Sequence, residues 1–219
     1  MIITIDGPAA AGKGTLAAKL AKKFALTYFD TGMVYRAVGL QMLQGKHSLE
    51  DKITAENFAK NLTFQKMMKL STNPDFRSLE GSRAASAVAA IPPVRAALLA
   101  MQQNFSKNPV FADGTPANGA IYDGRDTGTV VCPNADIKFF ITASPEVRAM
   151  RRFKEYQEKG EESSFEEVLA QTIARDKNDF ARESSHPAKD AIVIDTSDLS
   201  IEQVFEKVCG IIETKQKNA

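Results

Sequence analysis

Cysteine, histidine and long apolar runs are scarce in this sequence, and each shortage argues against a class of protein. Its 219 residues include two cysteines, Cys132 and Cys209, and two histidines, His47 and His186, with each pair far apart along the chain. So few thiols cannot form a disulfide framework or a zinc knuckle, and we expect them to be reduced in a cytoplasmic protein. The two histidines argue against a histidine-rich metal site. No apolar run approaches the roughly 20 residues that span a bilayer, and the first residues do not resemble a signal peptide.

An excess of charge of one sign is also lacking. Lysine and arginine number 28 and aspartate and glutamate 27, so the formal net charge is +1. Proteins that coat nucleic acid or an anionic membrane carry a strong positive excess, and we therefore expect neither partner. Net charge is an average, however, and a local cationic pocket remains compatible with it. Eight of the ten arginines fall in the candidate site segments described below: Arg36, Arg95, Arg125, Arg148, Arg151, Arg152, Arg175 and Arg182.

The order of elements expected along the chain is that of an α/β protein. The length suits one medium domain with a small inserted lobe, and 43% hydrophobic residues are enough for a core. Short apolar runs predict strands at residues 1–6, 26–30, 119–123, 135–142 and 191–195, with helical periodicity between them. Strands that alternate with helices pair in parallel, so we expect a central parallel sheet.

Residues 46–92 differ in character from the rest of the chain. They are mixed polar residues with weak periodicity, for which we expect a strand over 62–70 and a small-residue helix over 82–90. This segment is the candidate inserted lobe. Residues 1–45 and 93–219 would then form the core domain.

A glycine-rich loop joins the first predicted strand to the first predicted helix. It consists of Gly7, Pro8, Ala9, Ala10, Ala11, Gly12, Lys13, Gly14 and Thr15. The P-loop pattern G-x4-G-K-[ST] fits at Gly7, Gly12 and Lys13, with the hydroxyl one residue late, at Thr15. Backbone N–H groups and the helix N-terminus would bind phosphate oxygens, Lys13 would follow the transferred group, and Thr15 could hold Mg²⁺ or its water. The pattern favours a nucleotide site over a ligand-free turn, and it leaves kinase, GTPase and ATPase open.

The second predicted strand also ends in a turn that carries polar groups. Asp30 and Thr31 lie at its end, and Tyr35 and Arg36 follow on the next helix. The carboxyl ends of parallel strands line the ligand-binding edge of an open α/β sheet. Tyr35 offers a stacking face there and Arg36 a fork for phosphate. The alternative is a capped helix with both side chains on the surface.

The third predicted strand ends in Asp123 and is followed by a turn that contains two glycines. Asp123 could act as a carboxylate in the shell of a metal ion, as in many nucleotide-binding sheets. Arg125 and Asp126 would then project into the cleft. The alternative is a glycine-rich turn with a local ion pair.

Two predicted helices in the last third of the chain carry arginines on one face. Arg148 and Arg152 lie four residues apart on the first of them, beside Arg151. The second presents three side chains at i, i+4 and i+7, namely Arg175, Asp179 and Arg182. A mobile hairpin of this kind, over about residues 148–182, suits a lid that closes over polyphosphate. The alternative for each helix is a solvated face with ion pairs.

Taken together, these segments resemble the bacterial cytidylate kinases, a family of nucleoside monophosphate kinases. The resemblance covers nearly the whole chain, and residues 123–131 are its most specific motif. The other matching segments are residues 5–15, 30–36, 85–89, 94–95 and 175–182. It implies a P-loop NTPase-type three-layer fold with a central parallel sheet, a small insert that binds the nucleoside monophosphate (NMP), and a helical lid. The insert is expected to be trimmed relative to the family, because the segment at 67–75 is short.

The resemblance also implies roles for individual residues. ATP would be bound by the glycine-rich loop together with Arg148 and Arg152. The CMP site would comprise Thr31, Tyr35, Arg36, Ser86, Arg95, Arg125, Asp126, Arg175, Asp179 and Arg182. The catalytic cations would be Lys13, Arg36, Arg125 and Arg182. Within the CMP site, the cytosine edge would be read by Ser86, Arg95 and Asp126, and the ribose would be met by Arg175 and Asp179.

The activity implied is ATP-dependent phosphoryl transfer to CMP, and to dCMP, with Mg²⁺ as the cofactor. We expect a cytoplasmic monomer. One alternative is a P-loop kinase for another acceptor, such as UMP or a non-nucleotide alcohol. The other is a nucleotide-binding switch without transfer activity. A switch GTPase would need an N-K-x-D element, and residues 176–179 hold related residues in the wrong order.

Overall fold

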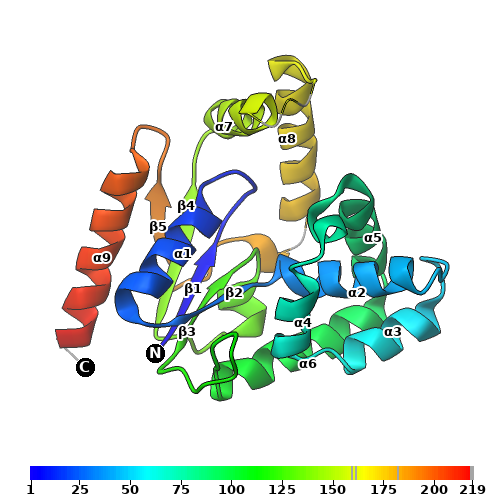
Figure 1. Ribbon diagram of the computed structural model, residues 1–219. Helices are drawn as coiled ribbons and strands as arrows, with labels where there is room; N and C mark the ends of the chain where they lie inside the picture. Colours follow the sequence, from blue (N-terminus) through cyan, green and yellow to red (C-terminus); the bar gives the residue numbers. More distant parts are fainter. Residues whose placement is uncertain (159, 161, 182, 218–219) are drawn as a thin grey trace. The chain divides into compact units, whose positions relative to one another are not determined.

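The computed structural model describes residues 1–158, 160, 162–181 and 183–217 (Figure 1). Internal contacts divide the chain into two compact units. We call Met1–Tyr28 with Ile121–Ala219 the sheet unit, and Phe29–Ala120 the helical unit. Each unit is described by itself below.

A five-stranded parallel sheet organises the sheet unit. Its strands are β1 (Ile2–Asp6), β2 (Thr27–Asp30), β3 (Ala120–Asp123), β4 (Ile137–Thr142) and β5 (Ile192–Asp195), in the order β2-β3-β1-β4-β5. Phe139 of β4 lies opposite Ile5 of β1 on one side and Ile192 of β5 on the other. All five strands expected from the sequence are confirmed, each within two residues of its predicted bounds.

The described residues of this unit also form four helices. They are α1 (Lys13–Phe24), α7 (Pro145–Glu158), α8 (Phe165–Phe180) and α9 (Ile201–Lys217), with the short turns η2 (Thr127–Val131) and η3 (Glu183–Ser185) between them. Figure 1 shows α1 and α9 side by side, and Leu20 and Val208 of these helices are fully buried in one apolar cluster with Ile5. A capping box begins α8, because the side chains of Ser164 and Glu167 each accept a hydrogen bond from the other residue's backbone N–H group.

The helical unit consists of helices, apart from the ends of β2 and β3 and one isolated β-bridge between Val110 and Pro116. The helices are α2 (Gly32–Gln44), α3 (Lys52–Lys60), α4 (Phe64–Leu70), η1 (Pro74–Arg77), α5 (Leu79–Ala89) and α6 (Pro92–Lys107). Its core contains three clustered rings, with centroids 5.5 Å apart for Phe29 and Phe64, 4.9 Å for Phe29 and Phe105, and 4.4 Å for Phe64 and Phe105.

The strand expected over residues 62–70 is wrong, because that segment forms α4. The hydroxyl of Thr63 accepts a hydrogen bond from the Lys66 N–H at 3.2 Å and so caps the helix. Phe64 and Met67 are buried three residues apart, which is helical spacing. The unbranched side chains between and after them also favour a helix over a strand.

Neither a membrane-spanning helix nor a cluster of metal-ligating side chains is found in the part of the chain that the structure describes. No single helix there is long and apolar enough to cross a bilayer; Glu80–Ala89 and Pro92–Lys107 pass only as a pair, bent by 95°. No group of three or more His, Cys, Asp and Glu side chains that could hold a metal ion is found among the same residues.

The packing of α2 on α5 depends on a glycine. A Cβ atom added at Gly39 would lie 2.8 Å from the backbone carbonyl carbon of Ala84 and from the backbone nitrogen of Ala85. Distances this short between a side chain and a backbone force one helix to move. The two helices can therefore approach this closely only because Gly39 has no side chain.

We predict that Gly39→Ala lowers the free energy of unfolding by about 1–3 kcal/mol, the usual cost of overpacking a core. Gly210→Ala, on the exposed face of α9, is the matched control, because nothing lies within 4 Å of a Cβ added there. It should raise stability by about 0.5–1 kcal/mol through helix propensity. Urea unfolding of both variants tests this, and equal effects would contradict it.

Candidate active site

The glycine-rich loop between β1 and α1 has the backbone geometry of an anion cradle. Gly7 has a φ of 141°, and a Cβ there would overlap the carbonyl oxygen of Ile141. Gly12, with a φ of 87°, is the N-cap of α1 and provides no side chain to cap its first turn. The N–H groups of that turn and the positive end of the helix dipole therefore face any anion bound in the loop.

Lys13 is held inside this loop. It is 6% exposed, its Nζ donates a hydrogen bond to the carbonyl oxygen of Pro8 at 2.9 Å, and Nζ lies 3.8 Å from Oδ1 of Asp123. Burial and the nearby Arg125 guanidinium lower the pKa of the Lys13 ammonium group to about 8, while Asp123 and Asp6 act in the opposite direction. The lysine is thus a charged group at neutral pH that water barely solvates.

Asp123, the last residue of β3, lies against the first turn of α1. Its Oδ2 accepts a hydrogen bond from the Tyr28 hydroxyl at 3.3 Å, and a Cβ at Gly14 would lie 3.3 Å from the same oxygen. Thr15, one residue later in α1, is exposed. The Asp123 carboxylate and the Thr15 hydroxyl are the hard oxygen donors that Mg²⁺ prefers, directly or through water, so the donor chemistry fits a magnesium–nucleotide complex.

The turn after β3 is tied to α8. The Nε of Arg125 donates a hydrogen bond to Oδ2 of Asp179 at 3.0 Å, and the Nε of Arg175 lies 3.9 Å from the same carboxylate oxygen. The structure therefore brings together three residues that the sequence assigned to one site. Asp126 lies in the same turn, between Arg125 and η2.

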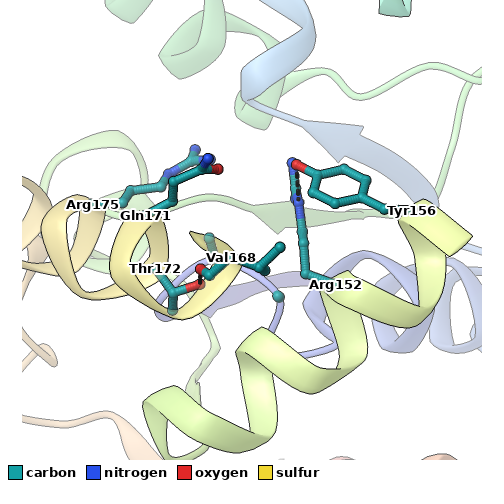
Figure 2. A pocket seen from close by; sticks show the side chains of 8 residues that line it. Arg152, Tyr156, Val168, Gln171, Thr172 and Arg175 are labelled. Carbon is teal, nitrogen blue, oxygen red and sulfur yellow. Dashed lines mark hydrogen bonds between the residues drawn. The ribbon is translucent and has the colours of Figure 1, made fainter. Parts of the chain in front are cut away.

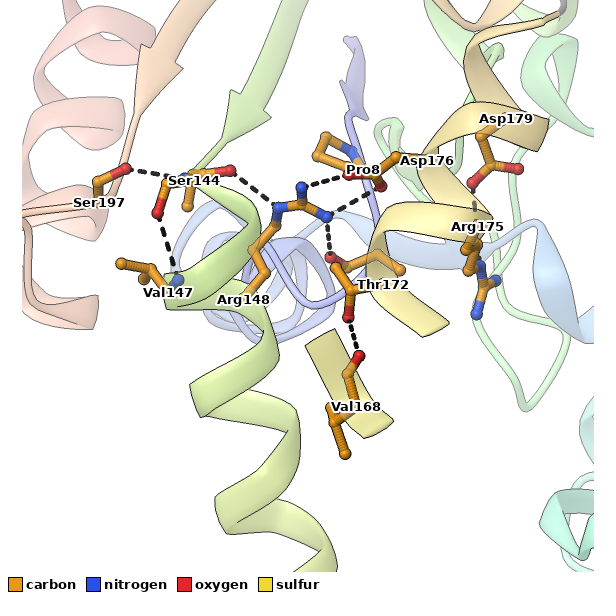
Figure 3. A network of polar contacts seen from close by, with 12 residues as sticks. Pro8, Ser144, Val147, Arg148, Val168, Thr172, Arg175, Asp176, Asp179 and Ser197 are labelled. Atoms are coloured by element: carbon orange, nitrogen blue, oxygen red, sulfur yellow. Dashed lines mark hydrogen bonds and ion pairs between the residues drawn. The ribbon is translucent and has the colours of Figure 1, made fainter. Parts of the chain in front are cut away.

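Arg148 has a different environment from the one expected of a lid arginine. It is 2% exposed, and its Nε donates to the carbonyl oxygen of Ala143 at 2.8 Å. Its terminal nitrogens donate to both carboxylate oxygens of Asp176, one at 3.0 Å, and to the carbonyl oxygen of Ala9 at 3.3 Å (Figure 3). Arg148 thus joins α7 to α8 and both to the phosphate loop. Asp176 was not predicted from the sequence, because a single acid on a mixed helix carries no signal of its partner.

A pocket lies beside the phosphate loop, lined by Ala9 and Ala10 and by side chains of α7 and α8 (Figure 2). Arg152 donates a hydrogen bond from Nε to the Tyr156 hydroxyl at 3.2 Å, and its guanidinium carbon lies 5.5 Å from the Tyr156 ring centroid. Arg175 also lines the pocket. Tyr156 was not predicted, although its position four residues after Arg152 places it on the same helix face.

Four predicted residues of the helical unit contact other side chains or the backbone of the same unit. Arg36 donates from Nη1 to Oγ of Ser82 at 2.9 Å, and the guanidinium carbon of Arg95 lies 5.8 Å from the Tyr35 ring centroid. Ser86 lies one turn after Ser82 on α5 and donates to its carbonyl oxygen at 3.0 Å. Ser82 was not predicted, and its only signal is the i, i+4 spacing to Ser86.

Two further predicted residues have simpler outcomes. Thr31 is the N-cap of α2 and is 9% exposed. Arg182 lies outside the described residues. The predicted residues described here thus fall into two sets, one in each unit, and their individual roles toward a ligand stay predictions.

We predict that Arg148→Met lowers the free energy of unfolding by about 3 kcal/mol or more, because it leaves the Asp176 carboxylate, 15% exposed, without its partner. Arg152→Met on the same helix should cost less than about 1 kcal/mol. In a double-mutant cycle, Arg148→Met with Asp176→Met should be more stable than the sum of the single changes implies. Additive effects in urea unfolding would contradict the pairing.

Comparison with known proteins agrees with these features. A family model described as cytidylate kinase matches residues 3–214. The cytidylate kinase of Paramagnetospirillum magneticum is 47% identical over 217 residues, which cover 98% of this chain and 99% of that protein. That of Bartonella henselae is 43% identical over 215 residues, 97% and 94% of the two chains. A crystal structure of an uncharacterized protein from Eubacterium ventriosum shares the fold, with a TM-score of 0.54 at 12% identity over 98% of both chains. This chain belongs to the cytidylate kinase family.

Proposed function

We propose that this chain transfers the terminal phosphoryl group of ATP to CMP, and also to dCMP, giving ADP and the pyrimidine diphosphate. The observation that carries the proposal is the position of Lys13 in a chain of this family. Lys13 is buried in the phosphate loop, and its Nζ lies 3.8 Å from Oδ1 of Asp123, the residue that ends β3. The reaction takes place in the cytoplasm, where both nucleotides are found, and the chain acts as a monomer.

ATP is bound by the loop from Gly7 to Thr15. Backbone N–H groups hold its phosphates, and the Lys13 ammonium group follows the group that moves. Arg152, which lines the pocket beside the loop, completes this side of the site. Mg²⁺ would be held by Thr15 and Asp123 together with phosphate oxygens and water, and it would supply charge neutralisation between the phosphates.

The CMP site under this proposal keeps the residues expected from the sequence, with residues 46–92 acting as the NMP insert. Tyr35 stacks near the cytosine, and Ser86, Arg95 and Asp126 read its edge, which presents an N4 amine to acceptors and O2 and N3 to donors. The arginines at positions 36, 125 and 182 hold the phosphate of CMP and the transferring group, and Arg175 and Asp179 meet the ribose.

Catalysis under this proposal is positioning and neutralisation of charge. Two polyanions must be held in line, and their mutual repulsion is the main obstacle. The acceptor oxygen belongs to a phosphate that is already ionised near neutral pH, so no general base is required. Buried cations such as Lys13 act more strongly there than they would in water.

A coupled assay over CMP, dCMP, UMP, AMP and GMP tests the proposal. We expect CMP and dCMP to be the best acceptors, because only cytosine presents the N4 amine and O2 together. Comparable turnover of AMP or GMP and none of CMP would contradict it. Hydrolysis of ATP that does not depend on any acceptor would favour a switch protein instead.

Arg95→Met should raise the KM for CMP about tenfold or more and leave the KM for ATP within about twofold, because one lost base contact is worth ~1–3 kcal/mol. Asp126→Ala should act in the same direction. Arg83→Met is the matched control, since Arg83 is an exposed cation of the same unit that no part of the proposed site uses. Equal losses toward CMP and ATP would contradict the assignment to the base.

The lowered pKa of Lys13 predicts an alkaline limit to activity. The group is protonated below pH 8 and loses its charge above it, so kcat/KM for ATP should fall with an apparent pKa of about 8. Bound phosphates favour the charged form, so kcat should fall at higher pH than kcat/KM. In the Lys13→Arg variant, the residual kcat/KM for ATP should not fall near pH 8. A wild-type profile that stays flat to pH 10 would contradict this.

A further inference from the structure

Asp6 is a buried charged group that the proposed mechanism does not use. It is the last residue of β1, directly before the phosphate loop, and it is 6% exposed. Its Oδ1 accepts hydrogen bonds from the backbone N–H of Thr127 at 2.9 Å and from the Thr127 hydroxyl at 2.8 Å. Its Oδ2 accepts one from the Gly128 N–H at 2.7 Å. All three donors come from the segment that directly follows Arg125 and Asp126.

Burying this carboxylate costs free energy, so the hydrogen bonds that it accepts must have good geometry. The pKa of the Asp6 carboxyl is raised, chiefly by burial and also by the nearby Asp126, while the hydrogen bonds from Gly128 and Thr127 oppose the rise. A buried carboxylate is tolerated only when such donors are held in place. The donors therefore have to stay where Asp6 needs them, and the backbone at 127–128 has little freedom.

The fit of this segment against the sheet is also tight. A Cβ at Gly128 would lie 2.9 Å from Oγ1 of Thr4, 3.2 Å from Cδ of Lys138 and 3.3 Å from Oδ2 of Asp6. Only a residue without a side chain allows the backbone to come this close. The contact therefore defines one register for the segment, and a shift by one residue would place a side chain in the gap.

The same segment also fixes the backbone of Asp126, one of the residues predicted to bind the acceptor. The carbonyl oxygen of Asp126 accepts hydrogen bonds from the N–H groups of Val130 at 2.8 Å and Val131 at 3.2 Å, which closes η2. The Thr129 hydroxyl donates to the carbonyl oxygen of Ser184, beyond the end of α8, at 2.6 Å. The backbone of Asp126 is thus enclosed by η2 on one side and by the Arg125–Asp179 pair on the other.

We propose that Asp6 is a positioning residue for the acceptor nucleotide: it holds residues 125–129 so that Arg125 and Asp126 meet CMP, and it couples them to the phosphate loop one residue away. The inference rests on the function proposed above. It explains why a carboxylate is kept at a position where an apolar strand residue would bury itself without cost. Its action is on the backbone of the acceptor loop, so it predicts a selective effect on CMP.

The test compares four variants with the wild-type chain. Asp6→Asn keeps the shape but turns one acceptor oxygen into a donor that faces a backbone N–H. Thr127→Val removes only the hydroxyl bond to Asp6, and Thr127→Ser restores it. Thr196→Val is the control just after β5. Thr196 is 2% exposed, and its hydroxyl donates a hydrogen bond to the Thr142 carbonyl oxygen at 3.0 Å and accepts one from Nη1 of Arg151 at 3.2 Å, away from the acceptor loop.

We expect Asp6→Asn to raise the KM for CMP about tenfold or more, as for loss of a hydrogen bond to a charged group, with the KM for ATP within about twofold. Thr127→Val should raise the KM for CMP by a smaller factor, and Thr127→Ser should stay within about twofold of wild type. Thr196→Val should lower the melting temperature as Thr127→Val does, with neither KM changed. If Asp6→Asn does not fold, the two Thr127 variants decide.

Two results would overturn the inference. One is a fall in melting temperature for the Asp6 and Thr127 variants with no change in the ratio of the two KM values. The other is a parallel rise in the KM for CMP and for ATP. A wild-type chain that phosphorylates another monophosphate instead of CMP would overturn the proposed function alone, and the same ratio would then be measured for that acceptor.

Discussion

The Lys13 ammonium group and the Asp123 carboxylate, 3.8 Å apart and nearly out of water, meet where β1 and β3 end. Much of the sheet unit is arranged to make that burial tolerable. Lys13 needs the Pro8 carbonyl oxygen, which requires the loop to turn back at Gly12. Asp123 needs the Tyr28 hydroxyl from β2. The order of the strands follows from the same requirement, because β1 has to lie beside β3 for the two charged groups to meet.

Buried charge recurs on the helices that follow β4. Arg148 is more buried than most apolar residues of α7, and its cost is offset by Asp176 and by two backbone carbonyl oxygens. A near-neutral chain can therefore hold a strongly cationic site. Arginine suits this role better than lysine, because its planar fork satisfies a carboxylate and several carbonyl oxygens at once.

Local signals predicted a large part of the fold. The strands could be predicted because short apolar runs end at aspartate or glycine, and the capping box of α8 because Ser164 and Glu167 are three residues apart. The error over residues 62–70 has a local cause as well. Its apolar residues suggest a strand, although Phe64 and Met67 follow helical spacing behind a capping threonine.

Local sequence patterns were enough to identify the chemistry of this protein: a phosphate loop, arginines placed in a few segments, and aspartates at the ends of strands. These features are local in the chain, and so is the physics that makes them recognisable. Which groups meet depends on the tertiary structure. Asp6 accepts hydrogen bonds from Thr127 and Gly128, which follow it by 121 and 122 positions in the chain. Arg148 pairs with Asp176 and not with another acidic residue of α8. Such pairings depend on how the backbone brings distant segments together, and a linear pattern of residues carries no information about the distance between them.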